Sequence, residues 1–182
     1  MVTESNSPPL HEPRVFMFDD GRHAAGLYQF EPPLDPEDVT YNVDQLVDSG
    51  ADTLVYFAGL EGGIVLYDSR VAQKWGDNVV EWTHPVWYRA WRYIQRLIAD
   101  GYDPLKLLCD RSHEKGIWFI AGNWVNFPGG DRETSGGLGR TSDFVYDHPQ
   151  FSVGEEDDPR AQYVSPNPFG FLHPEVRNER FL

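Results

Sequence analysis

The sequence predicts an α/β protein in which short buried strands alternate with amphipathic helices. Three apolar runs with the length and composition of strands lie at residues 14–18, 53–58 and 117–121, and polar or turn-forming residues follow each of them. Segments with apolar side chains at helical spacing come after the strands. Because strands and helices alternate along the chain, we expect a parallel sheet joined by right-handed crossovers.

The first strand and helix follow a polar, Pro-rich stretch. Residues 1–13 are expected to form a loose N-terminal arm, and residues 14–182 to belong to one domain. A helix is expected over 38–48, because its Val and Leu side chains fall on one face and Ser49-Gly50 ends it.

The later elements are separated by two long excursions. Residues 60–85 contain Gly, Tyr, Trp and Asp but little periodicity, and a second, Gly-rich excursion follows the third strand up to about residue 171. Loops of this length in compact domains tend to be functional. Helices are expected over 86–99 and 103–114, and a last helix opens at His173-Pro174 and continues to the final residue.

Composition and charge limit the classes of protein to which this chain can belong. The 182 residues suffice for one domain with a sizeable core, although a complete (β/α)8 barrel typically needs about 250. Hydrophobic residues make up 40% of the chain, which favours an ordered globular protein. The net charge of -14 repels phosphate backbones, so nucleic acid is not an expected partner.

Single residues and missing motifs exclude several further classes. Cys109 is the only cysteine, so an intrachain disulfide is impossible, and its apolar helical setting favours a buried structural thiol over a catalytic one. Neither GxGxxG nor GxxxxGK[ST] occurs, so no nucleotide cofactor is expected. No signal peptide and no apolar run of about 18 residues is found in the chain as given. The chain is therefore expected to be cytoplasmic, unless a leader was removed upstream, and to make no membrane contact.

The candidate site lies at the carboxyl ends of the strands, where parallel α/β folds collect their working groups. Carboxylate, amide and aromatic side chains suit sugars, because hydroxyl groups take paired hydrogen bonds and pyranose faces stack on flat rings. The residues expected to bind substrate are Asp20, His23, Glu61, Asn123, Trp124 and Asn126.

Each of these assignments has a structural alternative. Asp19 and Asp20 also suit a turn that ends the first strand, and His23 and Glu61 also suit exposed loop positions. Trp87 and Trp91, four residues apart on a helix, are expected to pack in the core rather than to form a sugar platform. The six histidines show no HxH or HExxH spacing, so no metal site is expected, and no GxSxG elbow of a serine hydrolase occurs.

Four segments carry a resemblance to a known group of proteins. These are YNVDQLVDSGADTLVYFAG, DPLKLLCDRSHEKGIWFIAGNWVN, SDFVYDHPQFSVGE and FGFLHPEVRNERFL. In this order they resemble the N-terminal half of glycoside-hydrolase-like TIM-barrel proteins of the family 10-like type. The resemblance covers about residues 14–182.

The resemblance implies a partial (β/α)8 TIM barrel of about three βα units, with long loops after strands two and three. It also implies that the acid pair needed for hydrolysis comes from later strands, beyond Leu182, so the catalytic residues are unknown. The chain would then be a fragment, a split gene product or a half-barrel that requires a partner. A carbohydrate is then the expected substrate. Because a partial barrel has open edges, self-association or a C-terminal partner segment is expected as well.

Three functional hypotheses remain open from the sequence. The first is a glycoside hydrolase-like protein that acts on or binds a polysaccharide or oligosaccharide. The second is a non-catalytic carbohydrate-binding or structural protein that kept the scaffold and lost the acid pair. The third is a metal-dependent barrel hydrolase with Asp19 and His23 as ligands.

Overall fold

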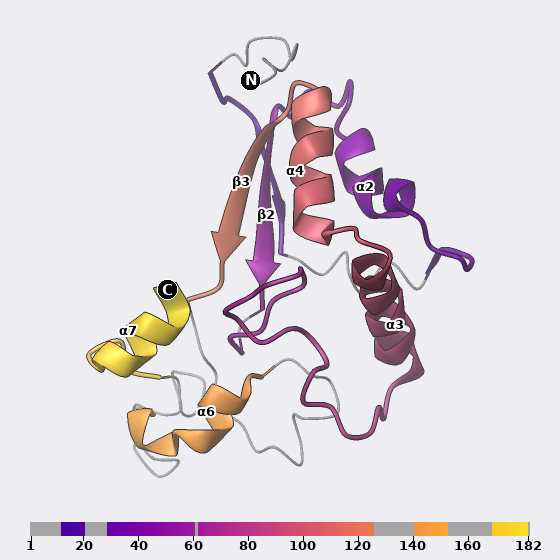
Figure 1. Cartoon of the computed structure of the whole chain (residues 1–182). Coiled ribbons are helices and arrows are strands. Elements are labelled where there is room, and N and C mark those ends of the chain that lie inside the picture. Colours follow the sequence, from indigo (N-terminus) through magenta and orange to yellow (C-terminus); the bar gives the residue numbers. More distant parts are fainter. Residues whose placement is uncertain (1–11, 21–28, 61, 126–140, 153–168, 182) are drawn as a thin grey trace, which may run out of the picture.

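The computed structural model describes residues 12–20, 29–60, 62–125, 141–152 and 169–181. Within these residues the elements follow one another as expected for an α/β protein (Figure 1). They are β1 (Phe16–Asp19), α2 (Pro36–Asp44), β2 (Thr53–Gly59), α3 (Pro85–Ala99), α4 (Pro104–Glu114), β3 (Trp118–Asn123), α6 (Asp143–Asp147), the 3-10 helix η3 (Pro149–Phe151) and α7 (Pro174–Phe181).

The three described strands form one open, parallel sheet in the order β1-β2-β3. Phe18 lies beside Val55, and Val55 lies beside Ile120, which fixes the register across the sheet. The predicted α/β class and parallel strand direction are therefore confirmed. The carboxylate of Asp52 holds the start of β1 by accepting hydrogen bonds from the backbone N–H groups of Arg14 and Val15, at 3.0 to 3.1 Å.

Helix α2 begins and ends earlier than the sequence predicts. Asp35 caps it by accepting from the N–H of Asp38, whose side chain accepts from the N–H of Asp35 in return, and Pro36 occupies the first turn. After Asp44 the expected last turn of the α-helix is replaced by hydrogen bonds between residues three apart, such as the bond from the N–H of Val47 to the carbonyl of Asp44. The apolar periodicity therefore runs past the end of the α-helix.

Helices α2, α3 and α4 stand on one side of the sheet (Figure 1). The core lies between this helical layer and the strand residues that point toward it, Leu54 and Tyr56, each at most 2% exposed. Val43 of α2 and Leu108 of α4 are fully buried in the same cluster. Burying a side chain of this size contributes roughly 1.5–3 kcal/mol, so this layer is the main source of stability.

A second, smaller cluster joins α6, η3 and α7 beyond the ends of the strands (Figure 1). Its buried members are Val145, Phe169 and Val176. The loop over residues 60–85 is hydrogen-bonded to the residue before α6, because the N–H of Ser142 donates to the carbonyl of Gly62, at 2.8 Å. Helix α6 has five residues, too few for apolar periodicity to predict it. No helix among the described residues combines the length and the hydropathy that a membrane span requires.

Candidate functional site at the carboxyl edge of the sheet

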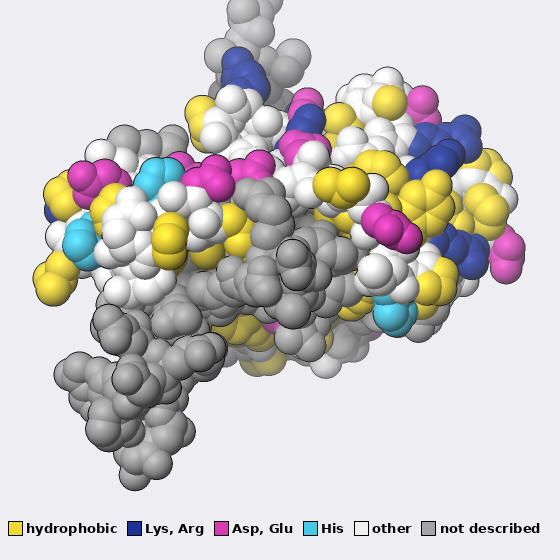
Figure 2. Space-filling view, turned by 90° about the horizontal axis from the view of Figure 1, so that it is seen from below, with side chains coloured by type: hydrophobic (Ala, Val, Ile, Leu, Met, Phe, Trp, Pro, Cys, Tyr) yellow, Lys and Arg dark blue, Asp and Glu magenta, His cyan; other side chains and the backbone are white. Residues whose placement is uncertain are grey.

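The carboxyl ends of the three strands bring together residues that are far apart in the sequence. Strand β1 ends at Asp19, β2 at Gly59 and β3 at Asn123. The side chain of Asn123 lies directly against Gly59, because a Cβ atom at Gly59 would overlap the Asn123 side-chain oxygen. Gly59 therefore leaves room for this amide at the edge of the sheet. Figure 2 views the molecule from the end toward which the strands point, and the described side chains visible there include acidic ones next to hydrophobic ones.

Trp124 connects the ends of the two outer strands. Its indole Nε1–H donates to the backbone carbonyl of Asp20, with 3.5 Å between N and O. Its ring centroid lies 5.0 Å from that of Phe57, which lies 4.8 Å from that of Phe18. This row of rings reaches from β1 across β2 to the residue after β3, and the Trp124 side chain remains partly exposed. A flat, partly exposed ring at a polar edge suits stacking against a sugar face.

Three of the six predicted site residues fall within the described part of the chain. Asp20, Asn123 and Trp124 are found together at the carboxyl edge, from the two outer strands. His23, Glu61 and Asn126 lie outside the described residues.

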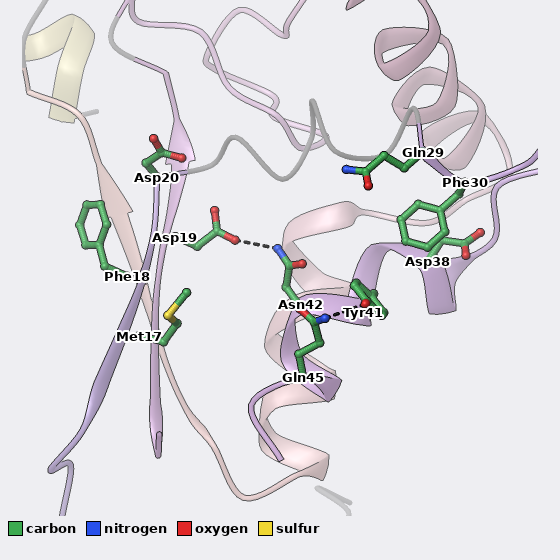
Figure 3. A pocket seen from close by; sticks show the side chains of 10 residues that line it. All are labelled: Met17, Phe18, Asp19, Asp20, Gln29, Phe30, Asp38, Tyr41, Asn42 and Gln45. Atoms are coloured by element: carbon green, nitrogen blue, oxygen red, sulfur yellow. Dashed lines mark hydrogen bonds between the residues drawn. The ribbon is translucent and has the colours of Figure 1, made fainter. Parts of the chain in front are cut away.

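A groove opens beside this edge, between β1 and helix α2, with a volume of about 690 Å³ (Figure 3). Its described lining consists mainly of carboxylates, amides and rings, and none of these described side chains is basic. The lining residues are Met17, Phe18, Asp19, Asp20, Gln29, Phe30, Asp38, Tyr41, Asn42 and Gln45.

Hydrogen bonds hold several of the groove's polar groups in place. The amide Nδ2 of Asn42 donates to Oδ2 of Asp19 at 2.7 Å, which ties the first helix to the end of the first strand (Figure 3). One turn further along α2, Nε2 of Gln45 donates to the hydroxyl of Tyr41 at 2.6 Å. Carboxylate and amide oxygens fixed in this way can accept hydrogen bonds from ligand hydroxyl groups.

The helix side of this groove is missing from the sequence-based site. A signal for it exists, because positions 38, 41, 42 and 45 have the i, i+3, i+4, i+7 spacing of one helical face and carry Asp, Tyr, Asn and Gln. This polar stripe lies beside the apolar one of Val39 and Val43. Only the position of α2 against the outer strand shows that the stripe faces a cavity.

Tyr56 is buried close to the carboxylates of Asp19, the last residue of β1, and of Asp20, which follows it. Burial raises its pKa well above the ordinary value, and the charges of Asp19 and Asp20 raise it further. The phenol therefore stays protonated and neutral at physiological pH and cannot serve as a base.

Two sequence-based expectations about single side chains have different outcomes. Trp87 and Trp91 pack against the main core, as predicted, in contact with the rings of Trp75 and Trp82. Cys109 was expected to be buried, but it is only partly buried on α4. Desolvation and then the charge of Asp110 raise the pKa of its thiol, so it lacks the low pKa of a catalytic cysteine.

The described residues contain no group of three or more His, Cys, Asp or Glu side chains that could hold a metal ion. Of the two ligands in the metal hypothesis, Asp19 bonds to Asn42 and His23 falls in a part of the chain that is not described.

No protein-family model matches this chain, and a search of curated proteins finds no significant match. Its function is therefore inferred from the chemistry of the carboxyl edge and the groove.

Proposed function

We propose that this chain is a glycoside-hydrolase-like protein that binds an oligosaccharide or polysaccharide at the carboxyl edge of its sheet. In this proposal the three described strands are the first βα units of a (β/α)8 barrel. The observation that carries the proposal is the groove between β1 and α2, where carboxylates, amides and aromatic rings come together and where the backbone carbonyl of the lining residue Asp20 accepts a hydrogen bond from Trp124.

The chemistry of the groove fits the surface of a sugar. A pyranose presents several hydroxyl groups, each a donor and an acceptor, together with one apolar face. Asp19, Asp20 and Asn42 offer acceptors for the hydroxyl groups, while Phe30 and Tyr41 offer rings. The volume of about 690 Å³ falls in the range of roughly 300–1,000 Å³ that small-molecule sites occupy.

The charge of the groove indicates which glycans it can bind. Among the residues that the structure describes, the groove is lined by Asp19, Asp20 and Asp38 and by no basic side chain, and the whole chain carries a net charge of -14. Such a field repels sulfated, phosphorylated or uronic-acid sugars. The favoured ligand is therefore a neutral glycan.

The role proposed for the described carboxylates is to position substrate. Hydrolysis needs two carboxyl groups on opposite sides of the glycosidic bond, about 5 to 9.5 Å apart. Asp19 and Asp20 are consecutive at one strand end, and Asp19 is engaged by Asn42. We therefore place the acid pair outside the described residues. Binding without hydrolysis by this chain would agree with that assignment.

The test is calorimetric titration of the 182-residue chain with a panel of neutral oligosaccharides. Trp124→Ala should weaken binding at least about tenfold, since stacking and packing on one aromatic ring are worth roughly 1.5 kcal/mol or more. Tyr102→Ala removes a ring that is 44% exposed in the turn before α4 and serves as the matched control, with unchanged affinity.

Binding that is equal in the parent chain and in Trp124→Ala would overturn the assignment of the site. A chain that binds no neutral glycan at millimolar concentration, while circular dichroism shows it folded, would overturn the proposed function itself.

A further inference from the structure

A helix that does not line the groove is bonded to one of the groove's walls. Nη2 of Arg89, on α3, donates to the backbone carbonyl of Phe30 at 2.7 Å, and the hydroxyl of Tyr93 donates to the same oxygen at 3.4 Å. Phe30 lines the groove, whereas its described lining includes no residue of α3. The backbone of a lining residue is therefore fixed by two side chains that lie one helical turn apart outside the groove.

The guanidinium of Arg89 is itself anchored to the core. Its Nε donates to the hydroxyl of Tyr93 at 2.7 Å, and its Cζ lies 5.5 Å from the centroid of the Tyr93 ring. The Tyr93 side chain is buried and belongs to the main hydrophobic cluster. Because the donors of a guanidinium lie in one rigid plane, Arg89 fixes the distance between this buried phenol and the carbonyl of Phe30.

The fixed carbonyl matters because of the place of the Phe30 ring. This ring lies edge to face with that of Tyr41, with 5.7 Å between the centroids and 76° between the planes. Both rings line the groove, and we call the pair of Phe30 and Tyr41 its aromatic wall. Figure 3 shows Phe30 across the groove from Asp19 and Asp20. A displacement of the Phe30 backbone would separate the two rings and change the width of the groove at this wall.

The partners of Arg89 show which of its properties the protein uses. The described ones are neutral, since they are a carbonyl oxygen, a hydroxyl group and an aromatic ring. Arg111, by contrast, forms an ion pair with the carboxylate of Asp44, at 2.8 Å. Among the described residues, Arg89 therefore provides two donors in a fixed geometry rather than one member of an ion pair.

We propose that Arg89 is a positioning residue of the groove, which holds Phe30 against Tyr41 and so presents the aromatic wall to a bound glycan. This inference rests on the proposed function, because it assigns the glycan as the ligand of the wall. It adds α3 to the elements that determine affinity. Arg89 itself does not contact the ligand, so its removal should act only through the ring of Phe30.

The position of Phe30 can be measured without a ligand. Para-fluorophenylalanine at position 30 of the full chain should give a fluorine NMR resonance that differs from that of the urea-unfolded chain, because the neighbouring ring shifts it. Arg89→Met keeps an unbranched side chain without donors, and should move the resonance toward the unfolded value. Arg92→Met is the matched control and should leave it unchanged, because Arg92 bonds to Tyr88 on the same helix and makes no described contact with Phe30.

Calorimetric titration with a neutral oligosaccharide measures the consequence for binding. Arg89→Met should weaken the affinity about fivefold, an effect of the size of one hydrogen bond, while Arg92→Met should bind like the parent. Arg89→Lys retains a charged donor on a flexible stem and should recover part of the affinity and of the resonance position. A residue that only stabilises the fold would lower the melting temperature and leave both readouts of the folded chain unchanged.

Tyr93→Phe removes the hydroxyl that anchors Arg89, and gives the same test if Arg89→Met fails to fold, as judged by circular dichroism. An unchanged fluorine resonance in a folded variant would overturn the proposal, and so would a shifted resonance with unchanged affinity. If the parent chain binds no neutral glycan, the proposed function fails, and the fluorine resonance alone decides whether Arg89 holds Phe30.

Discussion

The two faces of the sheet are built from similar residues but have different surroundings. On the helical side Leu54 and Tyr56 are at most 2% exposed, whereas Phe16 and Phe18, which point to the opposite face of the sheet, are more than half exposed. All four side chains are large and mainly apolar, and they occupy adjacent strands. Apolar character in a strand therefore does not decide whether a side chain is buried, because its burial depends on which elements pack against that face.

The largest expected effect is a difference in stability between the two faces. Leu54→Ala should lower the free energy of unfolding by about 2–5 kcal/mol, because it empties a site enclosed by the helical layer. Phe18→Ala removes a larger side chain, yet should lower it by only about 1 kcal/mol, because half of that ring already faces solvent.

Urea denaturation of the two variants measures this difference. Equal losses of unfolding free energy would mean that Phe18 is enclosed as fully as Leu54, and the contrast between the two faces would not hold.

A smaller effect is expected at alkaline pH and concerns the covered face alone. The pKa of Tyr56 is raised in the folded chain, so above pH about 10 the unfolded chain releases a proton that the folded chain retains. Unfolding is thereby favoured as pH rises, and stability is lost. Tyr56→Phe removes this contribution, so the loss of stability between pH about 8 and about 11 should be smaller than in the parent.

Tyr102→Phe, at a tyrosine that is 44% exposed, is the control and should retain the full alkaline loss of the parent. Urea denaturation at the two pH values gives the loss of unfolding free energy with rising pH for each variant. If this loss is the same for Tyr56→Phe and Tyr102→Phe, the phenol of Tyr56 is not shielded by the helical layer.

Much of the fold could be predicted from the sequence because its signals are local. Apolar runs and helical periodicity place each described strand and each of the longer described helices within a few residues. The parallel direction follows from their alternation. The early end of α2 and the five-residue α6 depend on individual turns and contacts, which periodicity does not encode.

The site was predictable only in part, for a physical reason. Residues at strand ends are found by reading the ends of apolar runs, which places Asp20, Asn123 and Trp124 at one edge. The other wall of the groove, with Tyr41 and Asn42, is formed only when α2 packs beside β1. Tertiary packing creates that wall, so a strand-by-strand inspection of the sequence cannot find it.

The most direct test of the proposed carbohydrate site is the Asn123→Ala variant, measured for glycan affinity and for thermal stability in the same preparation. Asn123 is exposed at the end of an edge strand, over Gly59. The account predicts that affinity for a neutral oligosaccharide falls about tenfold, as for the loss of one or two hydrogen bonds, while the melting temperature is unchanged. An unchanged affinity, or an affinity loss accompanied by a lower melting temperature, would show that Asn123 serves the fold and would contradict the assignment.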